Sequence, residues 1–126
     1  MTDFAWLTVA EAGELLRSRK LSPVEYTKAL IARVEKHDKQ YNAFLRFTPD
    51  LALEDATRAG AEIANGLWRG PWHGVPYALK DIVDYAGLPT TAHSWSVCDS
   101  SYGMNESSTT AFSFVGSLNT PARSIP

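Results

Sequence analysis

An apolar run with a single lysine in its middle limits what this chain can fold into more than any other segment. The run is "GVPYALKDIVDYAGLP" at residues 74–89. Apolar residues occupy both alternating sets of positions, which is the pattern of a strand covered on both faces. Glycines and prolines bound the run, as they commonly bound strands. We therefore predict a buried strand that contains Lys80.

Lys80 has a structural and a functional interpretation, and its position alone does not separate them. In the first, Lys80 and Asp81 end the strand, the lysine side chain reaches solvent, and Asp81 and Asp84 are turn or cap residues. In the second, Lys80 is held inside, where desolvation lowers its pKa and makes a neutral amine available as a base. A lysine placed in this way can also form a Schiff base with a carbonyl cofactor.

The first 66 residues carry several helix-start signals. Thr8 with Glu11 fits a capping box, and Ser22 and Glu25 repeat that spacing around Pro23, a residue suited to a first helical position. Further on, an alanine-rich face predicts a closely packed helix. The predicted order is a helix after Thr8, a helix from Pro23 to about His37, a strand over 43–47, a helix from Pro49 to Asn65-Gly66, and the strand with Lys80. This order indicates an α/β fold.

The composition changes near Ser96. Residues 1–94 carry 23 charged side chains, whereas residues 95–126 carry three and are rich in Ser, Thr, Gly and Asn. We therefore expect two regions. Residues 1–96 form part of a folded domain, and residues 97–126 are a divergent, low-charge, irregular tail, either disordered or the product of a shifted reading frame.

Charge and cysteine content exclude several classes of function. The net charge of −2 gives no basic surface for nucleic acid or for an anionic membrane. No stretch approaches the roughly 18 apolar residues of a membrane-spanning helix, and the acidic N-terminus is unlike a signal peptide. A single cysteine, Cys98, rules out an internal disulfide. We expect a cytoplasmic protein.

The lysine segment as a whole resembles the amidase signature family. "GPWHGVPYALKDIVDYAGLPTTAHS" at residues 70–94 is similar to that family's Gly-Pro-Leu-His-Gly-Val/Ile-Pro stretch, its strand ending in Lys-Asp, and its Ala-Gly-x-Pro-Thr-Thr-Ala turn. Upstream, "LSPVEYTKALIARVEKHDKQYNAF" at residues 21–44 resembles the family's N-terminal helix and the segment after it. The resemblance covers about Leu7 to Ser96, and Trp72, Tyr77 and His93 depart from the common pattern.

The resemblance implies a fold and a chemistry. The fold would be the N-terminal helices and first strands of the family's mixed-sheet α/β fold. Family members, which are related to the A subunit of glutamyl-tRNA amidotransferase, hydrolyse or transfer amides with a nucleophilic serine, a second serine on a cis peptide bond and a lysine. By position Lys80 matches that lysine, which accepts the nucleophile's proton through the second serine. The resemblance implies a small-molecule amide substrate and no metal or cofactor, and it leaves hydrolysis and amidotransfer open.

The serine part of the triad is missing from the expected pattern. The family's Gly-Gly-Ser-Ser-Gly-Gly segment does not occur in the chain, and the tail serines lack the glycine-flanked turn of a nucleophile. Cys98, even with His73 or His93, has no surroundings typical of a cysteine hydrolase. We expect an incomplete N-terminal fragment of an amidase that is inactive alone. The alternative is a short, non-catalytic binding protein derived from an amidase; the oligomeric state stays open.

Overall fold

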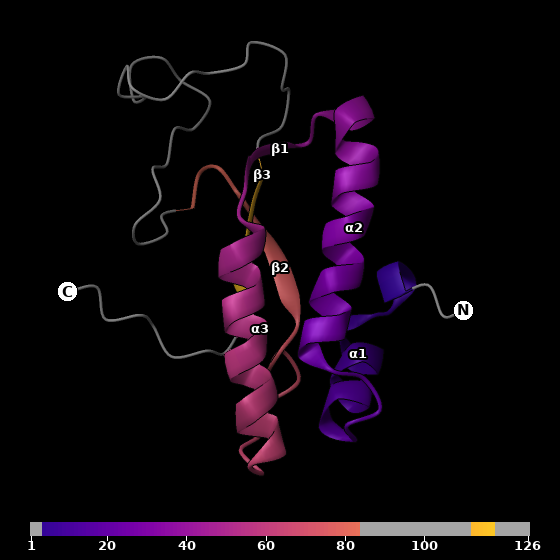
Figure 1. The fold of residues 1–126 in the computed structure, drawn as a ribbon, viewed down its shortest axis with the longest axis vertical. Helices are drawn as coiled ribbons and strands as arrows, with labels where there is room; N and C mark the ends of the chain where they lie inside the picture. The colour runs from indigo at the N-terminus through magenta and orange to yellow at the C-terminus, as the bar shows by residue number, and fades with distance from the viewer. Residues whose placement is uncertain (1–3, 84–111, 118–126) are drawn as a thin grey trace, which may run out of the picture.

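Three α-helices and a three-stranded sheet form the part of the chain that the computed structural model describes, residues 4–83 and 112–117 (Figure 1). The elements are η1 (Phe4–Trp6), α1 (Val9–Arg17), α2 (Pro23–Tyr41), β1 (Phe44–Phe47), α3 (Pro49–Ala64), β2 (Pro76–Lys80) and β3 (Phe112–Ser117). The predicted order of helices and strands up to Lys80 is confirmed, and with it the α/β class. The boundary expected near Ser96 lies outside the described residues.

Local capping explains where the helices begin. At α1 the backbone N–H of Thr8 donates to Glu11 Oε2 at 2.8 Å, and the Glu11 N–H donates back to Thr8 Oγ1 at 3.2 Å, which is the predicted capping box. These bonds hold the pKa of Glu11 below its ordinary value. At α2, Ser22 Oγ accepts from the Val24 N–H at 3.2 Å in place of the box predicted with Glu25.

Helix α2 continues to Tyr41, four residues beyond the predicted end at His37. It stops where Asn42 adopts a left-handed conformation with φ of 48°, which asparagine tolerates better than most residues. The Asp38 carboxylate then accepts from the backbone N–H groups of Ala43 and Phe44, at 2.7 and 3.2 Å. One aspartate therefore ends the helix and starts the chain into β1.

The sheet is mixed, as the predicted fold requires. Its strand order is β1-β3-β2, with β1 parallel and β2 antiparallel to β3. The central strand β3 comes from the region for which no regular structure was predicted. The alternating letters "FSFV" within it are a strand signal, but only pairing with β1 and β2 shows that this short segment lies in the middle of the sheet.

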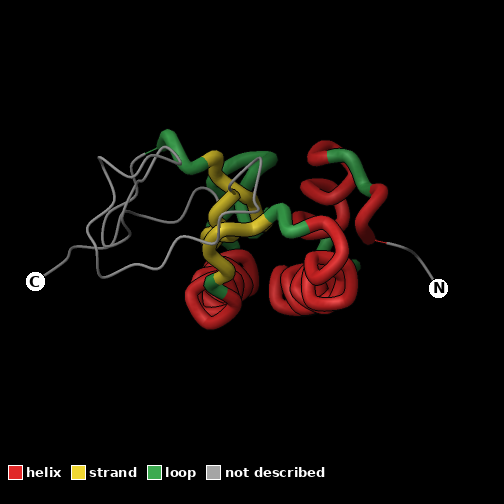
Figure 2. Tube along the Cα trace, turned by 90° about the horizontal axis from the view of Figure 1, so that it is seen from above, coloured by secondary structure: helices red, strands yellow, loops and turns green. Residues whose placement is uncertain are grey.

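The two long helices lie side by side and run antiparallel, with β1 joining them at one end (Figures 1 and 2). Helix α3 packs against both α2 and β3, and α2 also contacts β2. The predicted small-residue face of α3 makes this close approach possible: four of its five residues are buried, and only the last, Ala64, is exposed. The buried members are Ala52, Ala56, Ala59 and Ile63.

Strand β2 is less covered than its sequence predicts. Tyr77 and Leu79 are half-buried, whereas Ala78 and Lys80 are exposed. The prediction that both faces of this strand are covered is therefore wrong for the described chain. Apolar residues at both alternating sets of positions indicate a strand whose two faces are covered. They do not specify that the covering elements lie within residues 4–83.

The main core lies where α1, α2, α3 and the start of β2 meet. Its buried members are Ala12, Leu16, Leu21, Tyr26, Ile63 and Val75. Helix α1 approaches the loop of residues 66–75, which joins α3 to β2, so closely that a Cβ atom on Gly13 would lie 2.8 Å from the carbonyl oxygen of Pro71. Arg19, in the turn after α1, donates to the last carbonyls of α3, those of Ile63 and Ala64.

Replacing the two helical glycines with alanine tests the contact between α1 and the loop. A Cβ on Gly13 overlaps the Pro71 backbone, and overpacking costs about 1–3 kcal/mol. Gly60→Ala is the matched control, because its Cβ meets only the Pro23 ring at 3.8 Å and alanine gains about 1 kcal/mol of helix propensity. In urea titrations we expect Gly13→Ala to lower the free energy of unfolding and Gly60→Ala to raise it. An increase for both would contradict the contact.

Candidate functional site

Lys80 is the last residue of β2, and its backbone pairs with Phe112 of β3. Its carbonyl oxygen accepts from the N–H groups of Ile82 and Val83, at 2.7 and 3.0 Å, so the strand ends in a tight turn at this point. The Lys80 side chain is exposed. The described residues therefore leave the Lys80 amine open to solvent.

The residues after Lys80 are only partly described. Asp81 lies in the turn, as predicted, and is 7% exposed. Ile82 and Val83, directly after it, are 63% and 47% exposed. The other residues considered from the sequence lie outside the described part of the chain: Asp84, the turn at 86–92, His93, Cys98 and the tail serines.

The loop before β2 makes close contact with two helices. Pro71 lies against Gly13 of α1, as described above. Gly74, with φ of +84°, lies against the Pro23 ring at the start of α2: a Cβ on Gly74 would be 3.0 Å from Pro23 Cγ. Each of these approaches therefore needs a glycine, on the helix in the first case and in the loop in the second.

His73 joins the same loop to the third helix. Its side chain is fully buried, and its Nε2 lies 2.9 Å from Glu62 Oε2 in the last turns of α3. The backbone N–H of Arg69 donates to His73 Nδ1 at 3.3 Å. Because Nδ1 accepts this bond, Nε2 carries the proton and donates to Glu62. The Trp68 ring lies beside the imidazole, with 5.7 Å between ring centroids.

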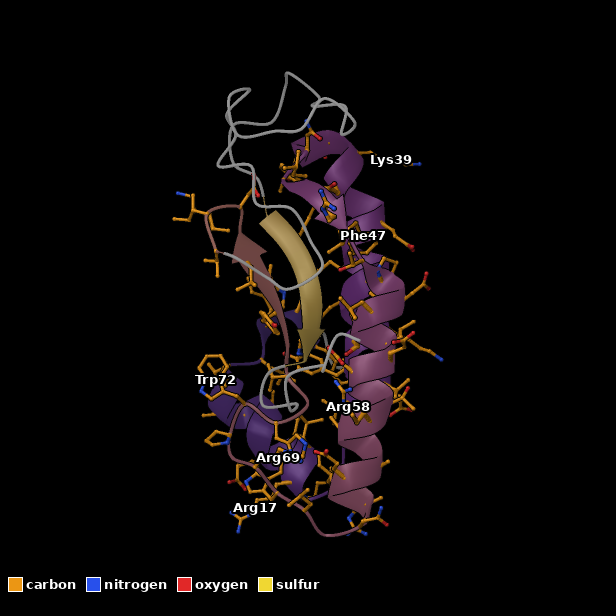
Figure 3. All side chains as sticks on the ribbon, turned by 90° about the vertical axis from the view of Figure 1, so that its left-hand side faces the viewer. Arg17, Lys39, Phe47, Arg58, Arg69 and Trp72 are labelled. Atoms are coloured by element: carbon orange, nitrogen blue, oxygen red, sulfur yellow. The ribbon has the colours of Figure 1, made fainter. Side chains whose placement is uncertain are left out.

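Glu62 is shared between His73 and Arg69. The Arg69 guanidinium donates to both carboxylate oxygens, with Nε–Oε2 and Nη2–Oε1 distances of 2.8 and 3.0 Å. The bonds from Arg69, followed by that from His73, hold the pKa of Glu62 below its ordinary value. In turn, the hydrogen bond to the Glu62 carboxylate raises the pKa of Arg69. Figure 3 shows Arg69 and Trp72 at the end of the molecule opposite Lys39 and Phe47.

Sequence analysis did not find the pair of Glu62 and His73. The histidine belongs to the motif that carries the family resemblance, but a lone histidine beside glycines carries no signal for a partner. Glu62 carries a sequence signal of its own, because it is a carboxylate next to the core residue Ile63 on an alanine-rich helix. Sequence periodicity could not pair them, because Glu62 lies in α3 whereas His73 lies in the loop after it, and a helical or strand period relates only residues of one element.

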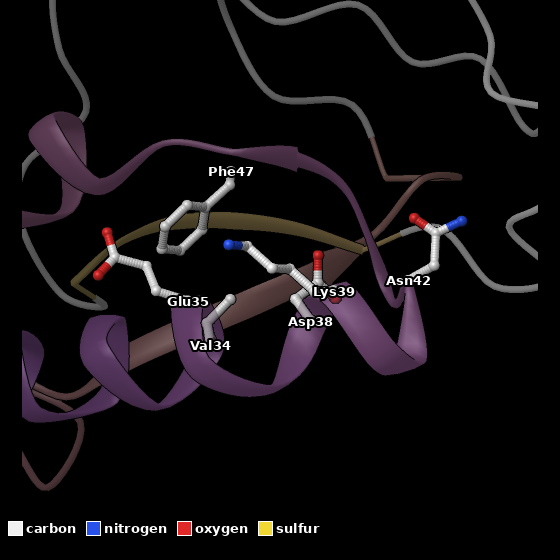
Figure 4. Close-up of a pocket in the computed structure, with 6 residues that line it drawn as sticks. All are labelled: Val34, Glu35, Asp38, Lys39, Asn42 and Phe47. Atoms are coloured by element: carbon white, nitrogen blue, oxygen red, sulfur yellow. The ribbon is translucent and has the colours of Figure 1, made fainter.

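A separate hollow lies at the other end of the molecule, between the last turns of α2 and β1 (Figure 4). Its lining residues are Val34, Glu35, Asp38, Lys39, Asn42 and Phe47. The Asp38 carboxylate is already committed to capping the start of β1. Lys80 is not among the residues that line this hollow.

Two kinds of site do not occur in the described residues. Within 4–83 and 112–117, no three His, Cys, Asp or Glu side chains are grouped so that they could bind a metal ion. In the same part of the chain, no helix has both the length and the apolar character needed to span a membrane. Lys80 and the loop that precedes it form the candidate site, because both lie in the segment of residues 70–94 that carries the family resemblance.

Known proteins resemble this chain across most of its length. A family model described as Amidase matches residues 25–102. An amidase of Pseudomonas putida is 40% identical over 98 residues, which cover 75% of this chain and 20% of that protein. The A subunit of glutamyl-tRNA(Gln) amidotransferase from Dehalococcoides mccartyi (strain CBDB1) is 42% identical over 94 residues, covering 75% and 19%. The chain thus spans about a fifth of the length of these relatives.

A solved structure agrees with the fold. The crystal structure of PAM12A superposes with a TM-score of 0.68 at 30% sequence identity, over 75% of this chain and 20% of that one. This chain therefore shares with that structure both its sequence pattern and its arrangement of helices and strands.

Gly74 and Gly66 form a matched pair that tests the contact with α2. Their φ angles are +84° and +85°, so alanine carries the same backbone strain at either position, about 1–2 kcal/mol. Only at Gly74 would the new Cβ also meet a neighbour, the Pro23 ring; at Gly66 nothing lies within 4 Å. We expect Gly74→Ala to lower the melting temperature clearly more than Gly66→Ala. Equal effects would show that the contact with Pro23 is loose.

The Glu62 carboxylate predicts a loss of stability in acid. Its pKa is below the ordinary value of 4.5, so its contribution is complete above that pH and is lost as the pH falls through the lowered native pKa. Glu62→Gln removes the charge at every pH. Thermal melts between about pH 3 and pH 7 should show the largest difference between the two proteins near neutrality and a shrinking difference below about pH 4.5.

An exposed glutamate provides the control for this measurement. Glu14→Gln alters a carboxylate whose ion pair with Arg17 is 4.0 Å long and open to solvent, and such pairs contribute about 0–1 kcal/mol. The network at Glu62 would be contradicted if the difference in melting temperature between wild type and Glu62→Gln did not change with pH. An equally large difference for Glu14→Gln would also contradict it.

Proposed function

Because the chain belongs to the amidase family, we propose that it supplies one segment of a hydrolase that acts on carbon–nitrogen amide bonds, with Lys80 as the catalytic base. The observation that carries the proposal is the position of Lys80. It is the last residue of a strand inside the matched region, with its side chain exposed and with no ion pair to a carboxylate of the described chain. An amine in this position is accessible to a partner that the rest of the enzyme provides.

The proposed chemistry is a proton relay. The nucleophilic serine attacks the amide carbonyl, its hydroxyl proton passes to a second serine, and the second serine's proton passes to the Lys80 amine. Only a neutral amine can accept a proton, and burial favours the neutral form of lysine. Lys80 is exposed here, so the proposal requires another part of the enzyme to cover it.

The serines of the relay are not recognisable in this chain. No Gly-Gly-Ser-Ser-Gly-Gly segment occurs in its 126 residues, and the chain spans about a fifth of its relatives. We propose that the 126-residue chain by itself does not hydrolyse amides. Small-molecule amides are the proposed substrates of the enzyme in which this segment works.

A non-catalytic binding role is the second candidate, and one observation favours it. Ile82 and Val83, which follow Asp81 in the turn after Lys80, are exposed although apolar, as on surfaces that bind another polypeptide. The two candidates differ in what they require of Lys80. A base must keep its amine, whereas an apolar binding surface does not depend on it.

Substitution of Lys80 tests the proposal in an active context. Residues 1–96 replace the corresponding segment of the Pseudomonas putida amidase, and turnover of a simple aromatic amide is measured. In an active chimera, Lys80→Ala should lower kcat by about 100- to 10,000-fold, the usual contribution of a general base, and Lys80→Arg should not restore it. Lys39→Ala, which alters an exposed lysine of α2, is the control and should retain full activity.

The two candidates give different results in this experiment. Activity retained within a few-fold in the Lys80→Ala chimera would refute the assignment of Lys80 as the base. Measurable turnover by the 126-residue chain alone, abolished by Lys80→Ala, would instead refute the proposal that the chain is inactive by itself.

A further inference from the structure

We propose that His73 is a positioning residue for Lys80: held as the Nε2–H tautomer between Glu62 and the Arg69 backbone, it sets the register in which β2 enters the sheet. The inference rests on the proposed role of Lys80 as a base. It concerns how the strand is placed, and His73 itself takes no part in the chemistry.

The hydrogen bonds of His73 fix the ring in one orientation. Nε2 donates to Glu62 Oε2 at 2.9 Å, and Nδ1 accepts from the Arg69 N–H at 3.3 Å. A flipped ring would place the carbon atoms Cδ2 and Cε1 against these partners, and the other tautomer would place a donor against the Arg69 N–H and an acceptor against the carboxylate. Only one orientation and one tautomer therefore satisfy both partners. The ring is fully buried, so water cannot replace either bond.

A short, ordered path connects this ring to the strand. The His73 N–H donates to Gly70 O at 2.9 Å and the Val75 N–H donates to Trp72 O at 3.1 Å, so the residues on either side of the imidazole are held in successive turns. Val75 is a core residue, and β2 begins at the next position. No flexible linker separates the fixed ring from the strand.

The strand needs such an anchor, because its own ladder begins irregularly. The pairing of β2 with β3 shifts between Pro76 and Tyr77, before the regular part that ends with Lys80 opposite Phe112. Burial specifies the register of β2 weakly, since its residues after Pro76 are only half-buried or exposed. A slip of one residue would move the Lys80 side chain to the opposite face of the sheet.

Burial also separates positioning from a direct role. With none of its surface exposed, His73 contacts no substrate. Its two ring nitrogens are occupied by Glu62 and Arg69, and no third metal-ligating group joins it among residues 4–83 and 112–117. The role left for His73 is therefore to fix the position at which the chain leaves the loop and enters β2.

Two measurements on the 126-residue chain test the proposal. The first needs no substitution: a long-range ¹⁵N–¹H NMR spectrum of the imidazole should show Nε2 protonated and Nδ1 unprotonated. The second is amide hydrogen exchange in His73→Phe, which preserves an aromatic ring but removes both hydrogen bonds. We expect the amides of residues 77–80 to exchange about tenfold faster while those of α2 change little, since a buried bond lost locally opens its own neighbourhood.

The control separates positioning from a general loss of stability. Ile31→Val removes one methylene group from the second core cluster, around Ile31 and Ala52, and should accelerate exchange in all elements to a similar extent. His73→Gln, which can still donate toward Glu62, should fall between wild type and His73→Phe at residues 77–80. It is also the second variant if His73→Phe does not fold.

The outcomes distinguish this inference from the proposed function. A protonated Nδ1, or a change in exchange for both His73 variants that is spread over all elements as in Ile31→Val, would overturn the positioning role. Neither result involves amide turnover, so both leave the assignment of Lys80 as a base intact. Conversely, an active Lys80→Ala chimera would refute the base assignment without changing the exchange pattern of β2.

Discussion

The close approach of the 66–75 loop to three helices is the constraint on which the rest of this structure depends. Pro71 meets α1 at Gly13, Gly74 meets α2 at Pro23, and His73 meets α3 at Glu62. Two of these contacts need a missing Cβ atom and the third needs a particular tautomer. Together they tie the start of β2 to every α-helix of the described chain, so the position of Lys80 follows from packing far from its own side chain.

Features set by neighbouring residues could be predicted from the sequence. The capping box of Thr8 and Glu11 and the start of α2 at Pro23 depend on hydrogen bonds within a few residues, and both are confirmed. Helix α2 ends four residues beyond the approximate position predicted, because Asn42 provides a left-handed cap that the apolar pattern does not reveal. Helix positions therefore follow from local chemistry more reliably at their beginnings than at their ends.

Features set by distant contacts could not be predicted in the same way. Strand β3 was missed because its place in the sheet depends on partners that are roughly 30 to 70 residues away in the chain. The exposure of Lys80 could not be predicted, because apolar residues on both faces of a strand do not identify the segment that covers those faces. The pair of Glu62 and His73 was missed because it joins a helix to a loop, and sequence periodicity relates only residues within one helix or strand. The candidate base was identified from its motif, and its surroundings came only from the structure.

The order of strands in the sheet also has a consequence for how the chain acquires its fold. The two outer strands, β1 and β2, both pair with β3, which is the last of the three in the sequence. During synthesis, all three helices leave the ribosome before either outer strand has its partner. The nascent chain can therefore dock its helices early, whereas the sheet closes only when residues 112–117 emerge. Until then, among the described residues, the strand that bears Lys80 is held by its loop and by its contact with α2.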